Sequence, residues 1–174
     1  MKKTWQRLVC VSLLSFTCAC GDTEEMAQGT DLQLLNMAKS TVDMTWYKNS
    51  DASLARSSGS GHNEPFLATR YNAIAAAVLD ANKKVDPSKL INGKFPEGSL
   101  IVKELRESDG TISKYAIMYK QAGHADEGGG WVWGYVRPNG NVAHAASEKG
   151  SICVGCHQNS SGSIDLTLMN AAFP

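Results

Sequence analysis

Cys153, Cys156 and His157 are the residues whose types and spacing most clearly indicate chemistry, because they form a C-x-x-C-H run. This is the pattern through which c-type haem is attached to a chain. Two thiols at this spacing can reach the two vinyl groups of one haem, and the adjoining histidine can bind its iron. We therefore expect one covalent haem c, attached through the two cysteines, with its iron bound by the histidine.

A cysteine pair of this spacing has two other common uses, a thioredoxin-like redox site and half of a zinc site. A redox pair normally begins a helix after a βαβ strand, but this pair lies about twenty residues from the C-terminal end with no such unit before it. A zinc site needs about four ligands, and the sequence has no second C-x-x-C. Haem attachment is the favoured interpretation.

The chain opens with a pattern typical of export. Lys2, Lys3 and Arg7 form a positive segment, and residues 8–19 form an apolar run of the length found in signal peptides. The run is too short to span a bilayer, which needs about 20 apolar residues. We predict a signal peptide over residues 1–20 and a location in the periplasm, where the conditions are oxidising and covalent haem attachment occurs.

The end of that segment resembles the cleavage site of a bacterial lipoprotein, in which a small residue precedes the cysteine that takes the lipid, here Cys20. Thr17 stands where such sites usually carry leucine, Cys18 is a weaker alternative, and ordinary cleavage nearby would leave a soluble periplasmic protein. We expect contact with a membrane only through this lipid. Only Cys153 and Cys156 then remain as thiols of the mature chain, so no disulfide framework is expected.

The composition predicts one ordinary globular domain. The chain has 174 residues, of which 43% are hydrophobic, and its 17 basic and 17 acidic residues give a formal net charge of zero. This balance indicates no polyanionic partner such as nucleic acid. We predict a polar tether over residues 21–30 and a single domain over residues 31–174.

The first half of the domain has helical patterns. Apolar residues recur at helical spacing over residues 31–47, where Asp31 can cap a helix. A second helical stretch is predicted within residues 64–84, and Asn72 could cap a shorter helix inside it. The Ser- and Gly-rich segment 50–61 between them is typical of a loop.

The second half has the pattern of antiparallel strands. Residues 99–105 and 112–120 predict two strands joined by a hairpin at Asp109-Gly110, and residues 131–137 predict an aromatic strand. The predicted fold class is therefore α+β, mostly antiparallel β-sheet with N-terminal helices and a C-terminal haem-attachment segment.

A lysine lies inside the first of these strands. Alternation gives each face of the strand two aliphatic residues and one charge, with Lys103 on one face and Glu104 on the other, so one charge is expected to meet an interior. A buried lysine is costly unless it is neutralised, paired or chemically modified. From the pattern alone, the favoured interpretation is that Lys103 lies near the strand end and extends to water.

The run FPEGSLIVKEL at residues 95–105, the Gly-Gly-Trp131 entry to the aromatic strand and the late C-x-x-C-H resemble the cytochrome P-460 family. The resemblance covers about the C-terminal half of the chain, from Phe95 onward. It implies a periplasmic c-type cytochrome with a mostly β fold, often dimeric, in which a lysine is cross-linked to the haem macrocycle. Lys103 aligns with that lysine, and the C-x-x-C-H residues align with the haem cysteines and the proximal histidine.

The resemblance leaves several functions open. Known members of the family oxidise hydroxylamine, whereas a related branch, cytochrome c-prime-beta, shares the fold, lacks the cross-link and binds nitric oxide. We expect a small nitrogen-oxide species, a substrate or a diatomic gas, to bind at an open distal iron site, with a periplasmic electron-transfer partner and a homodimer as further expectations. The alternative is an electron-transfer cytochrome with six-coordinate haem and no catalytic activity. Whether the chain is an enzyme is therefore left open.

The group on the far side of the iron separates these functions. Met118 and Met169 are candidate ligands, but core packing is the favoured interpretation for both. Some family members place a distal carboxylate after the second strand, and no residue of that region is a clear counterpart. His124, before a Gly-rich loop, is our candidate distal group, although a surface position is favoured for it as for His62 and His144.

Overall fold

The computed structural model describes residues 25–173. The signal peptide predicted over residues 1–20, the predicted lipid site at Cys20 and the first part of the tether predicted over residues 21–30 lie outside this range. Within residues 25–173, no helix is long and apolar enough to cross a membrane.

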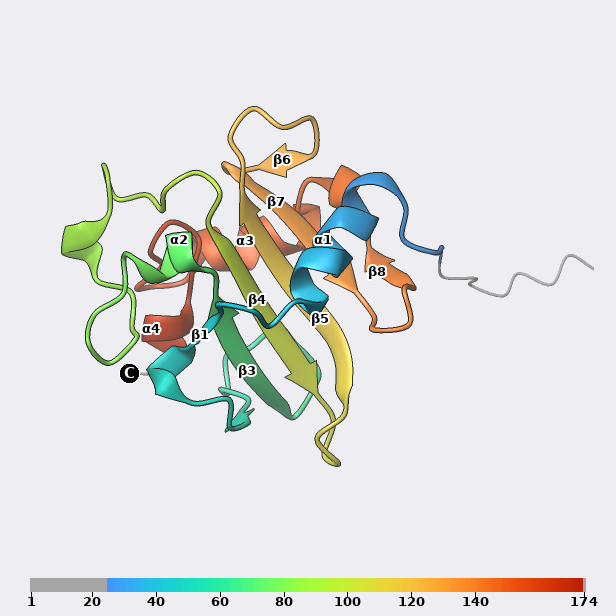
Figure 1. Cartoon of the computed structure of the whole chain (residues 1–174), viewed down its shortest axis with the longest axis horizontal. Coiled ribbons are helices and arrows are strands. Elements are labelled where there is room, and N and C mark those ends of the chain that lie inside the picture. The colour runs from blue at the N-terminus through green and yellow to red at the C-terminus, as the bar shows by residue number, and fades with distance from the viewer. Residues whose placement is uncertain (1–24, 174) are drawn as a thin grey trace, which may run out of the picture.

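An antiparallel sheet of eight strands forms the centre of the molecule (Figure 1). Its main path is β1-β3-β4-β5-β7-β6, with β2 paired to β3 and β8 paired to β7. The strands are β1 Thr45–Trp46, β2 Leu54–Ala55, β3 Phe66–Tyr71, β4 Leu100–Arg106, β5 Ile112–Lys120, β6 Glu127–Gly128, β7 Trp131–Val136 and β8 Val142–His144. The helices are α1 Gly29–Lys39, α2 Ala73–Ala76, α3 Ser151–Asn159 and α4 Met169–Ala172, with short 3₁₀ turns η1 Tyr47–Asn49, η2 Pro87–Lys89 and η3 Ala146–Glu148. The predicted α+β class, mostly antiparallel sheet, is confirmed.

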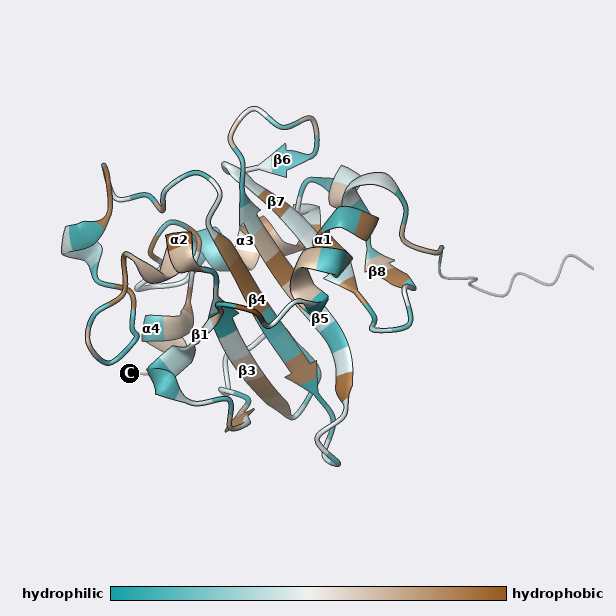
Figure 2. Cartoon of the chain, viewed as in Figure 1, coloured by the Kyte–Doolittle hydropathy of each residue, from teal (hydrophilic) through white to brown (hydrophobic). Residues whose placement is uncertain are grey.

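The sheet has a hydrophobic cluster on each face because its central strands are apolar on both sides. Ile101 of β4 packs with Trp131 and Trp133 of β7 on one face, and Val102 packs with Val136 on the other. Figure 2 shows the hydrophobic residues of β4, β5 and β7 at the centre of the fold. Each apolar face must be buried against another element. In Figure 1, α1 lies in front of the sheet and α3 behind it.

Helix α1 covers its face of the sheet closely. Leu34, Leu35 and Ala38 are buried against β5 and β7. Gly134 in the middle of β7 makes this approach possible, since a Cβ there would lie 2.7 Å from Leu34 Cδ1. This layer is separate from the side of the sheet on which the C-x-x-C-H helix packs.

The first helix differs from the prediction at both ends. It begins at Gly29, inside the segment predicted as a tether, after Met26 has formed an isolated bridge with Asn141 in the turn between β7 and β8. It ends at Lys39 instead of continuing to residue 47, because Thr45–Trp46 pairs as a strand with β3. The prediction of helix for residues 40–46 was therefore wrong, since sheet pairing overrides the local pattern, and Tyr47 lies in the 3₁₀ turn η1.

The helical stretch predicted within residues 64–84 is also corrected. Residues 66–71 form strand β3, which pairs with β4 along its whole length and with β1 and β2 on its other side. Only Ala73–Ala76 is helical, and it is capped as predicted, since Asn72 Oδ1 accepts a hydrogen bond from Ala75 N at 2.9 Å. Pairing with a distant strand decided the conformation of residues 66–71, since Ala68 stands opposite Glu104, 36 positions along the chain.

The strands predicted for the second half are confirmed. β5 has the predicted bounds, and β4 and β7 differ from them by one residue at their ends. Glu107 N donates to Thr111 O at 2.9 Å in the hairpin between β4 and β5. The C-x-x-C-H segment packs on one face of the sheet that these strands form.

Candidate functional site

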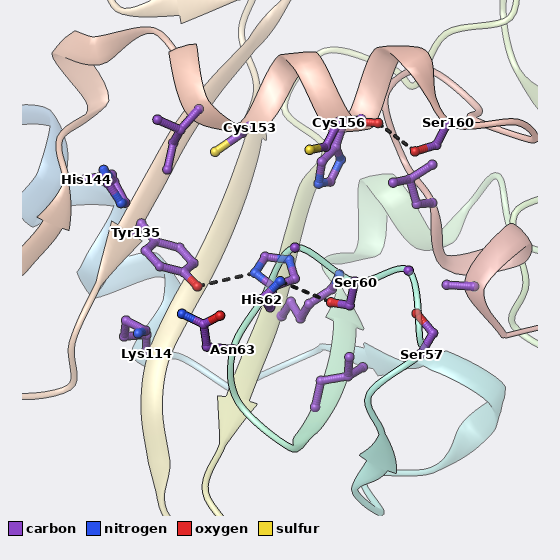
Figure 3. A pocket seen from close by; sticks show the side chains of 18 of the residues that line it. Ser57, Ser60, His62, Asn63, Lys114, Tyr135, His144, Cys153, Cys156 and Ser160 are labelled. Carbon is purple, nitrogen blue, oxygen red and sulfur yellow. Dashed lines mark hydrogen bonds between the residues drawn. The ribbon is translucent and has the colours of Figure 1, made fainter.

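The C-x-x-C-H residues lie on α3, behind the sheet. Cys153 and Cys156 are three positions apart and His157 is four positions from Cys153, so a helix places all three on one side. Both cysteines are free thiols, and their sulfur atoms point from α3 into a cavity (Figure 3). Burial, with smaller effects from Glu148 and Cys156, raises the pKa of Cys153 to about 11.

The start of α3 is fixed by two close contacts with the sheet. Gly150 precedes the helix with φ of +64°, and a Cβ there would lie 2.4 Å from the ring of Trp133. A Cβ on Gly128 would lie 1.9 Å from the carbonyl oxygen of Lys149. Because Gly128 and Gly150 have no Cβ, helix α3 can begin in direct contact with β6 and β7.

The cavity has a volume of about 730 Å³. Its walls are α3, the loop of residues 57–63, the C-terminal residues 168 and 171–173, and side chains from β3, β4, β5, β7 and β8. The volume is within the range of roughly 300–1,000 Å³ found for cofactor and ligand sites. In Figure 3 the loop that carries Ser57, Ser60 and His62 lies across this space from Cys153 and Cys156.

His157 is oriented by the chain that follows α3. Its Nδ1 lies 2.6 Å from the carbonyl oxygen of Leu166, and its ring meets the indole of Trp133 edge-on at 5.2 Å between centroids. A carbonyl can only accept, so Nδ1 carries the proton and Nε2 keeps its lone pair. Burial, and to a lesser extent Lys103, lower the pKa of His157, while the bond to Leu166 opposes them. A neutral imidazole with Nε2 unprotonated is the form that binds a metal.

Lys103 lies in the middle of β4, opposite Thr69 and Ala116 of the neighbouring strands, and its side chain lines the cavity. It makes no hydrogen bond or ion pair with any of residues 25–173. Burial lowers the pKa of its ammonium group to about 8. Lys103 therefore does not lie near the strand end, as the sequence pattern favoured, but presents an unpaired amine to the same space as the two cysteines.

The cavity has a second lysine, which differs from Lys103 because its amine is paired. Lys114 of β5 also lines the cavity, but its Nζ lies 2.6 Å from a carboxylate oxygen of buried Glu64. That pairing lowers the pKa of Glu64 against the opposing effect of burial. Of these two amines, only Lys103 has no counter-charge.

His62, for which its sequence context favoured a surface position, lines this cavity. It is partly buried in the loop before β3, its Nδ1 lies 3.3 Å from the hydroxyl of Tyr135, and the two rings stack at 6.0 Å. Burial first, then the charges of Lys103, His157 and Lys114, lower its pKa to about 3. The ring is therefore neutral near pH 7. The sequence did not indicate that His62 faces the cavity, because the segment that follows it was predicted to be a helix and not strand β3.

The other predicted iron-site candidates lie elsewhere. His124 is on the loop between β5 and β6, where its Nδ1 accepts from Asp126 N at 3.0 Å, and it is not among the residues that line the cavity. Met118 is buried in the core, and Met169 Sδ accepts a hydrogen bond from Thr69 Oγ1 at 3.3 Å. The structure thus brings Lys103 together with the C-x-x-C-H residues, and it keeps His124 and both methionines out of the cavity lining.

Residues 66–166 match the family model of Cytochrome P460, which is more than half of the 174 residues. The chain belongs to the cytochrome P460 family. No curated protein matches the chain. Membership in this family makes the chain a c-type haem protein that binds iron, and its cavity fits such a cofactor in size and in donor set. Two free thiols and an imidazole with an available Nε2 enter one cavity from one helix.

Proposed function

We propose that the chain is a periplasmic cytochrome that carries one haem c and acts on a small nitrogen-oxide species, oxidising hydroxylamine or binding nitric oxide. In this proposal Cys153 and Cys156 form the thioether links and His157 binds the iron, leaving its other side open. Bound haem supplies an iron that takes up the small molecule and passes electrons to a periplasmic partner. The observation that carries the proposal is the unpaired amine of Lys103 in the cavity of the haem motif.

The state of Lys103 supports a covalent role for it. An amine with a pKa of about 8 is partly neutral at pH 7, and a neutral amine is nucleophilic. The absence of an acidic partner among residues 25–173 leaves the amine free to react. We therefore propose that Lys103 forms the lysine–haem cross-link known in the family, in which its Nζ would replace one hydrogen of the macrocycle. This substitution releases two protons and two electrons, and the electrons would pass to a two-electron oxidant such as a peroxide. The cross-link would adjust the electronic structure of the haem.

Replacing Lys103 with methionine is expected to keep haem on the cysteines but to move its main absorption band and abolish hydroxylamine oxidation. The reason is that methionine has similar bulk but no amine. Protease digestion and mass spectrometry of the wild-type holoprotein should show haem joining the Lys103 peptide to the Cys153–Cys156 peptide. In Lys103→Met, haem should remain on the cysteine peptide alone.

Lys114→Met is the matched control, because it removes an amine from the same cavity that is already paired with Glu64. It should keep the cross-linked peptide and the wild-type absorption band. An unchanged spectrum in Lys103→Met would remove Lys103 from the site. Absence of haem from both wild-type peptides, in a host able to mature c-type cytochromes, would overturn the haem assignment itself.

The position of His62 in the cavity supports a second candidate function. It is a neutral imidazole in the cavity, on a loop across from α3 (Figure 3), and its Nε2 has no hydrogen-bond partner among residues 25–173. Such a group can interact with a small molecule at the open side of the iron. Alternatively, it can bind the iron itself, which would give a six-coordinate electron carrier.

We expect His62→Leu to leave the ferrous haem high-spin and to slow hydroxylamine oxidation by about tenfold or more, since a positioned acid or base typically contributes at least that much. His144→Leu is the control, because His144 also lines the cavity and packs on the ring of Tyr135 at 5.6 Å. Conversion of a low-spin wild type into a high-spin His62→Leu protein would instead support the electron carrier. The absorption spectrum of the reduced protein separates the two cases.

The location rests on the first twenty residues. A positive segment, a short apolar run and the cysteine at position 20 support export, with Cys20 carrying a lipid. The mass of the mature N-terminal peptide from a membrane fraction tests this proposal. A lipid-free N-terminus would leave a soluble periplasmic protein.

A further inference from the structure

The segment after the haem-motif helix contains a turn that is unfavourable for its residues. Ile164 and Thr167 pair through Thr167 N to Ile164 O at 2.8 Å and Ile164 N to Thr167 O at 3.0 Å. The two residues between them, Asp165 and Leu166, have φ of +44° and +66°. Two successive left-handed residues normally call for glycine or asparagine, and leucine is rarely found there. Such a conformation persists only where the surrounding structure imposes it.

Asp165 is held by three separate segments of the fold. Its carboxylate oxygens lie 3.0 and 2.9 Å from Lys120 Nζ at the end of β5, and Phe95 N donates to the same carboxylate at 2.9 Å. Trp131 Nε1 of β7 donates to the Asp165 carbonyl at 3.0 Å. The side chains of Lys120 and Asp165 are only 3% and 5% exposed, so water weakens their ion pair little.

The strained turn presents one group to the site. The carbonyl of Leu166 accepts the hydrogen bond from His157 Nδ1 at 2.6 Å. A hydrogen bond at this nitrogen fixes the tautomer, holds the ring plane and raises the basicity of the ligating nitrogen. A more basic ligand favours the ferric over the ferrous state, so this bond influences the reduction potential of a haem bound to His157.

We propose that Lys120 and Asp165 are positioning residues, and that their buried ion pair holds the 164–167 turn so that the Leu166 carbonyl keeps its hydrogen bond to His157. The pair acts on the haem through the backbone and touches neither haem nor substrate. This inference rests on the proposed function, because it requires His157 to be the iron ligand.

The test is Asp165→Asn in the holoprotein. Asparagine keeps the size, tolerates the left-handed conformation and removes the charge that Lys120 pairs with. We expect haem to stay attached, the reduction potential to rise and the iron–histidine stretching frequency of the ferrous protein to fall. The expected change is about tenfold in the ferric-to-ferrous preference, which is about 59 mV for one electron.

A rescue variant separates positioning from general damage. Leu166→Gly in the Asp165→Asn background keeps the carbonyl and removes the strain, so it should move the potential back toward the wild-type value. Glu104→Gln breaks another buried ion pair, on the other face of the sheet, and should lower stability without moving the potential. If Asp165→Asn gives no holoprotein, the double variant Lys120→Met/Asp165→Asn, which leaves no unpaired buried lysine, is measured with the same expected shift.

The measurements separate a positioning role of the ion pair from a purely structural one, and both from a wrong assignment of the iron ligand. A lower melting temperature with unchanged potential and iron–histidine frequency would overturn the positioning role and make the pair structural only. A wild-type spectrum that survives in His157→Ala would overturn the proposed axial ligand, and with it the proposed function on which this inference rests. A shift in Asp165→Asn that Leu166→Gly reverses would establish the positioning role.

Discussion

Gly150→Ala is expected to remove most of the folded holoprotein. The left-handed backbone at this position costs a residue with a Cβ roughly 1–2 kcal/mol. The added methyl group would lie 2.4 Å from the buried indole of Trp133, and such overpacking typically costs about 1–3 kcal/mol. Trp133 packs against the ring of His157, so its displacement would also reach the proposed iron ligand. Holoprotein yield and the denaturant midpoint measure the effect.

The matched control is Gly155→Ala in the same helix. A Cβ at Gly155 meets nothing within 4 Å, and its φ is not left-handed, so alanine should be tolerated and should favour the helix. Equal yields and midpoints for the two variants would show that the contact between Gly150 and Trp133 does not fix the start of α3. A loss confined to Gly150→Ala would show that this contact positions the haem-motif helix.

Much of the fold was predictable because its signals are local. The strand 112–120 has matching bounds in sequence and structure, and Asn72 caps α2 as its residue type suggests. The C-x-x-C-H spacing alone places its three side chains on one side of a helix. In each case the residues that define the feature are neighbours in the chain, so no distant contact is needed to recognise it.

The parts that could not be predicted depend on contacts between distant residues. Residues 66–71 have no strong strand pattern and become β3 through pairing with β4. Missing that strand also hid His62, whose loop enters the cavity only because β3 lies beside the strand of Lys103. The turn at Asp165 and Leu166 carries no glycine, proline or asparagine, and its conformation follows from anchors on Phe95, Lys120 and Trp131, which belong to other segments.

Lys103 and Glu104 of β4 meet interiors on opposite faces of the sheet, although only one of these two charges was expected to be buried. Glu104, 4% exposed, pairs with Arg70, which is 1% exposed, and with Arg106, whose Nε donates at 3.1 Å. Arg70 also donates to the carbonyl of Ala38 in α1, so the pair joins the sheet to the helix that covers it. Lys103, on the other face, has no such partner among the described residues.

Glu104→Ala is expected to destabilise the protein by about 3–5 kcal/mol, because removing one partner of a buried ion pair leaves the other charge uncompensated. Glu107→Ala, an exposed glutamate just beyond the same strand, should change the unfolding free energy by less than about 0.5 kcal/mol. The double variant Arg70→Met/Glu104→Leu should recover much of the loss, since apolar side chains of similar volume often replace a buried pair without penalty. Chemical denaturation of the three variants and the wild type, all as holoproteins, measures these differences. A loss under about 1 kcal/mol in Glu104→Ala would mean that water reaches Arg70 once the carboxylate is gone, and that the α1 layer is held by its apolar contacts alone.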